Sequence, residues 1–203
     1  HQGLICTFTH LDLAQKFLDS TWVQAYRERA RELWSGILSV QSARGHWDKQ
    51  AWLSTSPEAL VGQSDPQGPV AVLTRASIVP TKAMAFWRYA PAAQAGLSQS
   101  QGCLLSMGLG EAPLVRQCTF SLWQDMAAML QYAQQGAHQV ASAAAYKHQF
   151  FSESLFVRMQ VLEMAGVWQG QTFDVSNHAP LAVNASVHLE PALTSPDLEP
   201  SHA

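Results

Sequence analysis

Between residues 70 and 168, the hydrophobic positions predict a strand, a helix, two strands, a helix and a strand, in that order. The first strand is the β-branched run 70–78, which ends before Pro80 because proline cannot continue a strand ladder. Apolar residues at helical spacing follow over 83–89, and Pro91 is expected to end that helix.

The second half of this unit follows a polar stretch. A short apolar strand is predicted over 103–107 and an alternating strand over 115–123, separated by a turn at 108–113. Asp125 is expected to cap a second helix, and the last strand covers 155–164.

Three short sequence runs of this unit have similar counterparts closer to the N-terminus. The paired runs are Cys6-Thr7-Phe8 with Cys118-Thr119-Phe120, Asp12-Leu13-Ala14 with Asp125-Met126-Ala127, and Gly45-His46-Trp47 with Gly166-Val167-Trp168. We interpret these pairs as an internal repeat. Its first copy has a long helix over 12–34 and a closing strand over 36–42, without a counterpart of 70–107.

The repeat predicts four regions along the chain. Residues 1–50 are a partial first ferredoxin-like repeat and 51–68 a linker, followed by a complete second repeat at 69–171. Residues 172–203 are rich in proline and polar residues, which predicts an extended or disordered tail.

A strand–helix–strand–strand–helix–strand unit folds as a four-stranded antiparallel sheet with two helices on one face, the ferredoxin-like plan. Two such sheets can close a barrel around an apolar ligand. We therefore expect an α+β fold of tandem ferredoxin-like repeats in a barrel-like arrangement, with the first repeat incomplete in this numbering. We expect that the missing half either belongs to an N-terminal segment before residue 1 or leaves a sheet edge that a partner chain must cover.

Composition narrows the function classes. The 203 residues are 47% hydrophobic and 13% charged, with a net charge of -3 and no basic run, which argues against nucleic acid as a partner. So little charge favours an apolar surface that meets another subunit, a membrane face or an apolar ligand. The three cysteines lack CxxC spacing, so neither a zinc site nor a disulfide framework is predicted. We find no apolar run long enough to span a membrane and no secretion signal, so we expect a cytoplasmic location. Peripheral contact with a membrane is a further expectation.

Several runs carry a family resemblance: 69–78, Phe86-Trp87-Arg88, 108–113, 118–123 and Gly136-Ala137-His138, with 34–47 upstream. Together they resemble the spheroidene monooxygenase family, over about residues 4–171. The resemblance implies a dimeric α/β-barrel type of fold and a haem-dependent monooxygenase that inserts oxygen at the terminal C2 of acyclic carotenoids. It also implies haem b with its iron, a hydrophobic small-molecule substrate, an electron donor such as a ferredoxin, and a homo-oligomer.

His138 is the expected axial iron ligand, because it follows Gly136 in an apolar helical stretch and matches a family position. The alternative is a histidine on the helix surface or one that only supports another ligand. His148 is the rival ligand, ten residues further along the same predicted helix.

Arg75 is a cation inside an apolar strand, and since arginine keeps its charge it requires an anionic partner or water. It is expected to pair with a haem propionate or to donate a hydrogen bond to oxygen at the iron. The alternatives are a structural pair with Glu111 or an outward orientation. Arg116 has a similar setting and is a second expected haem contact.

The sequence is also compatible with two other functions. The same barrel fold supports cofactor-free oxygenases, which need a general base and a dry pocket. A non-catalytic module that binds a hydrophobic ligand or haem is the other alternative.

Overall fold

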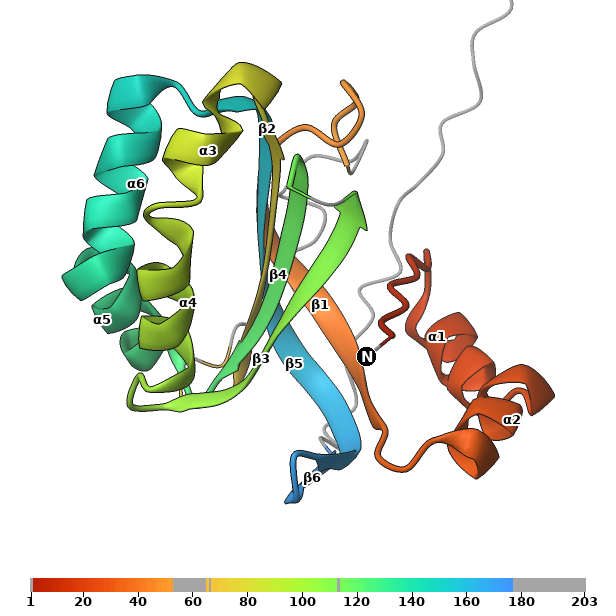
Figure 1. Cartoon of the computed structure of the whole chain (residues 1–203). Coiled ribbons are helices and arrows are strands. Elements are labelled where there is room, and N and C mark those ends of the chain that lie inside the picture. Colours follow the sequence, from red (N-terminus) through yellow and green to blue (C-terminus); the bar gives the residue numbers. More distant parts are fainter. Residues whose placement is uncertain (1, 53–64, 66, 113, 177–203) are drawn as a thin grey trace, which may run out of the picture.

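The computed structural model describes residues 2–52, 65, 67–112 and 114–176 (Figure 1). The strands are β1 (Trp34–Gly45), β2 (Val70–Ile78), β3 (Cys103–Ala112), β4 (Arg116–Trp123), β5 (Phe151–Trp168) and β6 (Gln171–Ser176). The helices are α1 (Leu11–Leu18), α2 (Thr21–Arg29), α3 (Ala83–Phe86), α4 (Ala90–Ser98), α5 (Met126–Gln134) and α6 (Gly136–His148), with a 3-10 turn η2 (Pro80–Lys82) before α3.

All six strands lie in one antiparallel sheet, in the order β1-β5-β2-β4-β3, with β6 paired to the end of β5. Helices α3 and α4 follow β2, and α5 and α6 follow β4, so β2 to β5 form a complete ferredoxin-like unit. These four helices cover one face of the sheet, whereas α1 and α2 lie apart from them, beyond β1 (Figure 1). The predicted α+β fold class with a ferredoxin-like unit is confirmed.

The closing strands of the two predicted repeats, β1 and β5, lie side by side. Their register runs from Trp34 opposite Gly166 to Gly45 opposite Leu155. The N–H of His46, just after Gly45, donates to the Ser154 carbonyl (3.0 Å), and the N–H of Val167, just after Gly166, donates to the Leu33 carbonyl (2.9 Å). The two strands are therefore related by a local pseudo-two-fold axis.

Both glycines of this pair are required by their backbone. Gly45 has φ +96° and Gly166 has φ +118°, a conformation that side chains rarely adopt. A Cβ at either position would also collide with the main-chain oxygen of Ser154 or of Leu33. By contrast, Cys6-Thr7-Phe8 is not part of a strand, although its predicted counterpart lies in β4.

Several predicted boundaries were wrong for local reasons. The helix expected over 12–34 is two helices, because Ser20 caps α2 by accepting a hydrogen bond from the Val23 N–H. Pro91 begins α4 instead of ending a helix, since proline fits the first helical turn. The strand expected over 103–107 continues to Ala112.

The expected tail at 172–203 begins as a strand, because β6 pairs with β5 from Gln171 opposite Trp168 to Ser176 opposite Glu163. Residues 177–203 lie outside the described part of the chain, as does most of the predicted linker at 51–68. Of the helices in the described ranges, none has both the length and the apolar character that crossing a membrane requires.

The core occupies both faces of the sheet, because side chains alternate along each strand. On one face, Val72 packs with Trp123 and with Leu97 and Met129 from the helices. On the other face, Leu73 belongs to a second cluster, in which the Trp34 ring on β1 lies 5.5 Å from a ring on β4. Since β5 and β2 separate β1 from β4, this contact requires a curled sheet, and we call its concave side the inner face.

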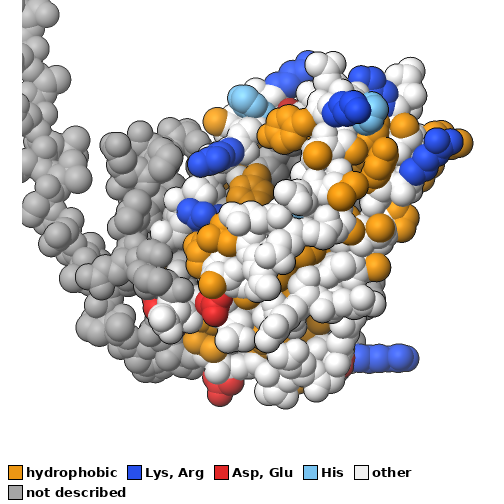
Figure 2. Space-filling view, turned by 90° about the vertical axis from the view of Figure 1, so that its left-hand side faces the viewer, with side chains coloured by type: hydrophobic (Ala, Val, Ile, Leu, Met, Phe, Trp, Pro, Cys, Tyr) orange, Lys and Arg blue, Asp and Glu red, His pale blue; other side chains and the backbone are white. Residues whose placement is uncertain are grey.

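The outer surface of the helices α3 to α6 has a mixed character. Hydrophobic side chains are scattered over it among polar and basic ones (Figure 2). Exposed examples are Met84, Val140 and Tyr146. Single exposed apolar residues of this kind are normal on a protein surface.

Candidate functional site

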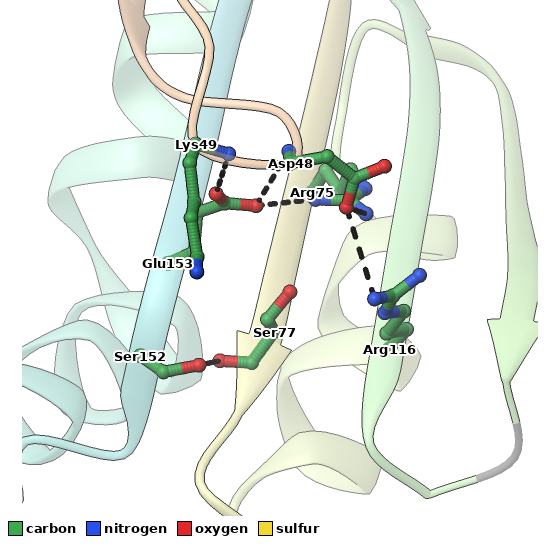
Figure 3. Close-up of polar contacts among 7 residues, drawn as sticks. All are labelled: Asp48, Lys49, Arg75, Ser77, Arg116, Ser152 and Glu153. Atoms are coloured by element: carbon green, nitrogen blue, oxygen red, sulfur yellow. Dashed lines mark hydrogen bonds and ion pairs between the residues drawn. The ribbon is translucent and has the colours of Figure 1, made fainter.

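Arg75 lies on the inner face of the sheet, between Cys118 on β4 and Leu155 on β5, and is only 1% exposed. Its Nη1 donates to Oε1 of Glu153 at 2.7 Å, and its Nη2 lies 3.3 Å from Oδ1 of Asp48 (Figure 3). A buried guanidinium is tolerated only when anions of this kind compensate its lost hydration.

The Asp48 carboxylate belongs to a tight turn that follows β1. Trp47 and Gln50 exchange main-chain hydrogen bonds (2.8 and 3.1 Å) around Asp48 and Lys49, which have φ +50° and +66°. Left-handed conformations at both central residues are typical of a type I′ hairpin turn. The Trp47 ring lies over the Arg75 guanidinium, 4.5 Å from its central carbon, which adds a cation–π contact.

Glu153 connects this turn to Arg75. Its two carboxylate oxygens accept the N–H groups of Lys49 (2.6 Å) and Asp48 (3.0 Å) as well as the Arg75 guanidinium. These hydrogen bonds, that of the Lys49 N–H first, lower the pKa of Glu153. Glu153 therefore stays ionised and holds the turn against the sheet.

Arg116 joins the same cluster from β4. Its Nη2 lies 3.7 Å from Oδ1 of Asp48, although its side chain is about half exposed. The structure thus brings the two predicted arginines together through a carboxylate that sequence reasoning missed. The Glu111 side chain, an alternative partner for Arg75, lies outside the described part of the structure.

An open hollow of about 500 Å³ lies beside this cluster. It is lined by Gly45, His46, Lys49, Phe151, Ser152, Glu153 and Ser154. The hollow is polar, so it suits a hydrogen-bonding ligand better than a hydrocarbon chain.

His138 occupies a different place, in the first turn of α6. Its Nδ1 lies 3.2 Å from the Ala133 carbonyl oxygen, and its ring centroid lies 4.7 Å from that of Tyr132. If Nδ1 carries the proton and donates to this carbonyl, Nε2 keeps a free lone pair. Burial raises the pKa of Tyr132 to about 12, so its phenol stays neutral and donates to the Ala93 carbonyl at 3.1 Å.

The hollow next to His138 lies between α4, α5 and α6 and has a volume of about 300 Å³. Small-molecule sites occupy about 300–1,000 Å³, so this hollow is at the lower limit. Its lining includes no lysine or arginine that could pair with a propionate. In that tautomer His138 Nε2 would be able to bind an iron, but the hollow in this conformation does not fit the whole haem.

His148 lies at the opposite end of α6, where it is exposed and its ring stacks on Phe150 at 5.3 Å. Ten residues of helix separate it from His138 by about 15 Å along the axis. The two histidines therefore cannot bind the same iron. Among the described residues, no group of three or more histidine, cysteine or acidic side chains is placed to hold a metal ion.

The structure does not bring Arg75 and His138 together. His138 belongs to the helices that cover the Val72 face of the sheet, whereas Arg75 shares the inner face with Leu73. The sheet lies between them, so at most one of these residues can contact a given ligand.

The relatives found by sequence comparison are spheroidene monooxygenases. The chain is 46% identical over 173 residues to a spheroidene monooxygenase of Rubrivivax gelatinosus, a match that covers 85% of this chain and 64% of the relative. It is 36% identical to the spheroidene monooxygenase of Rhodobacter capsulatus, covering 71% of this chain and 60% of the relative. With that of Cereibacter sphaeroides it shares 33% identity, over 75% of this chain and 46% of the relative. The chain thus spans about half to two thirds of these relatives' lengths, and no family model matches it.

Similar solved structures cover about half of this chain. One is a conserved protein from Methanosarcina mazei, with 12% identity and a TM-score of 0.39 over 46% of this chain and 92% of that protein. Another is SnoaB, a cofactor-independent oxygenase from Streptomyces nogalater, with 15% identity and a TM-score of 0.35 over 52% of this chain and 96% of that protein.

Proposed function

The chain belongs with the spheroidene monooxygenases by sequence, and on this premise we propose that it takes part in the oxygenation of an acyclic, carotenoid-like substrate. The observation that carries this proposal is the 46% identity over 85% of the chain with the Rubrivivax gelatinosus relative. Identity at that level across most of a chain is more specific than fold, which hosts many unrelated activities.

The inner face of the sheet is filled by apolar side chains. Leu73, Phe120, Val157 and Met159 from three strands are buried there in one cluster, with the partly buried Trp34 ring against them. The sheet separates this cluster from His138, so we assign it to the stability of the fold and not to the substrate. A hydrocarbon polyene offers no hydrogen-bonding groups, so its binding would depend on apolar contacts on the His138 side of the sheet.

Haem is the proposed cofactor, and His138 would hold its iron. When bound, haem would supply the activation of dioxygen, with electrons from a donor such as a ferredoxin. In this chain the Ala133 carbonyl would fix the orientation of the His138 ring, and the ring of Tyr132 would pack beside it. The small hollow at His138 would have to widen to admit the macrocycle.

In this proposal Arg75 has a structural role and does not contact the haem. Its guanidinium already has two carboxylate partners on the inner face, so we assign it to positioning the turn at residues 47–50 beside the apolar cluster. Arg116 supports the same turn through Asp48.

The oxygenation proposal is tested by expressing the chain in a host that accumulates spheroidene. We expect the extracted carotenoid to gain one oxygen atom by mass spectrometry, and we expect His138→Ala to abolish this product. Gln139→Ala, a change at the exposed neighbour of His138, is the matched control and should leave the product unchanged. Unmodified spheroidene with this chain, under conditions in which the Rubrivivax gelatinosus relative forms product, would contradict the proposal.

The cofactor is tested separately by titrating the purified chain with haemin. A saturable Soret band that disappears with His138→Ala and persists with His148→Ala is the expected result. Oxygenated product without a Soret band would point to a cofactor-free oxygenase. Haemin binding without product would point to a binding module.

A further inference from the structure

The turn that follows β5 is built like the turn at residues 47–50, which follows β1. Its two central residues, Gln169 and Gly170, have φ +50° and +76°, close to the values in the first turn. The carboxylate of Glu32 accepts the N–H groups of both residues at 2.8 Å. Glu32 therefore holds its turn in the same way as Glu153 holds the turn at residues 47–50.

The two carboxylates are equivalent under the pseudo-two-fold relation between β1 and β5. Each lies two residues before the strand position that is opposite a glycine of this pair, since Glu153 precedes Leu155 and Glu32 precedes Trp34. The chain thus contains a second copy of the site that holds Arg75, at the other end of the β1–β5 pair.

The two copies differ in the cation. In the first, Arg75 donates to Glu153 (Figure 3) and also lies against the Trp47 ring. In the second, Trp168 has the place of Trp47 in the repeated run, but among the described residues no cation lies within ion-pair distance of Glu32. All 12 lysines and arginines of the chain belong to the described residues, so residues 1–203 do not supply this cation.

A strand brings the cation to the first copy. Arg75 reaches Glu153 because β2 pairs with β5 in antiparallel fashion and places Arg75 opposite Leu155. The corresponding place in the second copy lies along the other edge of β1, opposite Trp34. Since β1 ends the sheet order, no strand in the described part of the chain pairs with that edge. The main-chain donors and acceptors of such an edge can bind a further strand.

The helices that precede β1 lack the contact that the equivalent helices have. Helices α5 and α6 precede β5, and α5 packs Met129 against Val72 of β2. Helices α1 and α2 precede β1 and lie beyond it (Figure 1), but α1 buries no residue, and Leu13 and Trp22 are more than 40% exposed. A strand added to the free edge of β1 would lie next to these helices and offer them an apolar contact.

We propose that the free edge of β1 binds an extended peptide strand, antiparallel to β1, whose arginine lies opposite Trp34 and pairs with Glu32 beside Trp168. Arginine fits this site better than lysine, because a planar guanidinium binds a carboxylate and stacks on an indole ring at the same time, as Arg75 does. The strand belongs to a polypeptide segment outside residues 1–203. This inference goes beyond the proposed oxygenase function and does not depend on it.

The probe is a synthetic nine-residue peptide with the sequence of β2, Val70–Ile78, because β2 fills the equivalent site. Isothermal titration calorimetry measures its binding to the complete 203-residue chain. We expect saturable binding. Replacing the arginine of the peptide with citrulline, which has the same shape without the charge, should raise the dissociation constant about tenfold or more, because a charge-assisted hydrogen bond is lost.

Variants of the chain locate the site. Glu32→Gln should weaken binding of the arginine peptide by a similar factor and leave that of the citrulline peptide unchanged. Glu28→Gln is the matched control, because it removes one exposed acidic charge from α2 and should have no effect. Circular dichroism shows whether each variant is folded. Hydrogen exchange of the main-chain amides should slow in β1 when the peptide binds, and not in β3, the strand at the other edge of the sheet.

Four results would overturn the proposal. The first is the absence of binding up to the highest soluble peptide concentration, and the second is equal affinity for the arginine and citrulline peptides. The third is slower exchange in β3 without a change in β1. The fourth is an equal loss of affinity with Glu28→Gln and Glu32→Gln, which would show a general attraction between charges and not an arginine site.

Discussion

At the scale of single residues, Arg75 shows what makes a charge tolerable in an apolar sheet. The sequence marks it as exceptional, since it is a cation within a β-branched strand. Its partners Glu153 and Asp48 are 78 and 27 residues away in the chain, so no local pattern could identify them. The sequence therefore predicted the need for an anion or water, but it pointed to a haem propionate or Glu111 and not to Glu153 and Asp48.

Replacing Arg75 with methionine should destabilise the protein by about 3 kcal/mol, because two carboxylates then lose the cation that compensates them. The free energy of unfolding in urea measures this effect. Arg116→Met should change it by less than about 0.5 kcal/mol, since that side chain is half exposed. The double variant Arg75→Met with Glu153→Gln should lose less than the sum of the two single changes, because the two residues form one network. Strict additivity would show that they act independently.

The lowered pKa of Glu153 gives the cluster a pH dependence with a definite sign. Since the folded-state pKa lies below the unfolded value of about 4.3, ionised Glu153 stabilises the fold above that pH. This contribution is lost as the pH falls through the folded-state pKa. The difference in unfolding free energy between the parent and Glu153→Gln should therefore be constant near neutral pH and shrink below about pH 4. A difference that grows on acidification would contradict a lowered pKa of Glu153 in the folded protein.

At the scale of secondary-structure elements, the β1–β5 pair depends on two glycines. Gly45→Ala and Gly166→Ala should each cost at least about 2 kcal/mol, because alanine is strained at these φ values and its Cβ meets a main-chain oxygen. Gly96→Ala is the control, since Gly96 lies inside α4 with no neighbouring atom within 4 Å. It should stabilise the protein by about 0.5–1 kcal/mol. Thermal unfolding of the three variants measures these effects.

The sequence predicted the bounds of the strands better than those of the helices. The β-branched run placed β2, and alternation placed β4 to within one residue. The helices were placed less well. Pro91 is compatible with either a helix start or a helix end, and Ser20 interrupts an apolar pattern that otherwise continues.

At the scale of the whole molecule, the sheet separates the two residues that the sequence assigned to a single haem. If haemin binds at His138, Arg75→Met should leave its dissociation constant within about twofold, since the sheet lies between the two side chains. His138→Ala should raise it at least about tenfold, the lower end of the effect of disturbing a metal ligand or its support. Absorbance titrations of both variants, with circular dichroism as the folding control, measure this. A loss of haemin affinity with Arg75→Met but not with His138→Ala would place haem on the inner face of the sheet.

The sequence by itself determined the fold class, the order of the elements in the complete unit and the family relationship. Periodicity, turn residues and the repeated landmarks are local properties of the chain, so they can be read without knowing which segments meet. The tertiary structure alone decided that β1 continues the same sheet beside β5, and that the Asp48 turn covers Arg75. It also decided that His138 and Arg75 face opposite sides. These features depend on contacts between distant residues and on which face each strand presents, and a one-residue change of register would reverse that face.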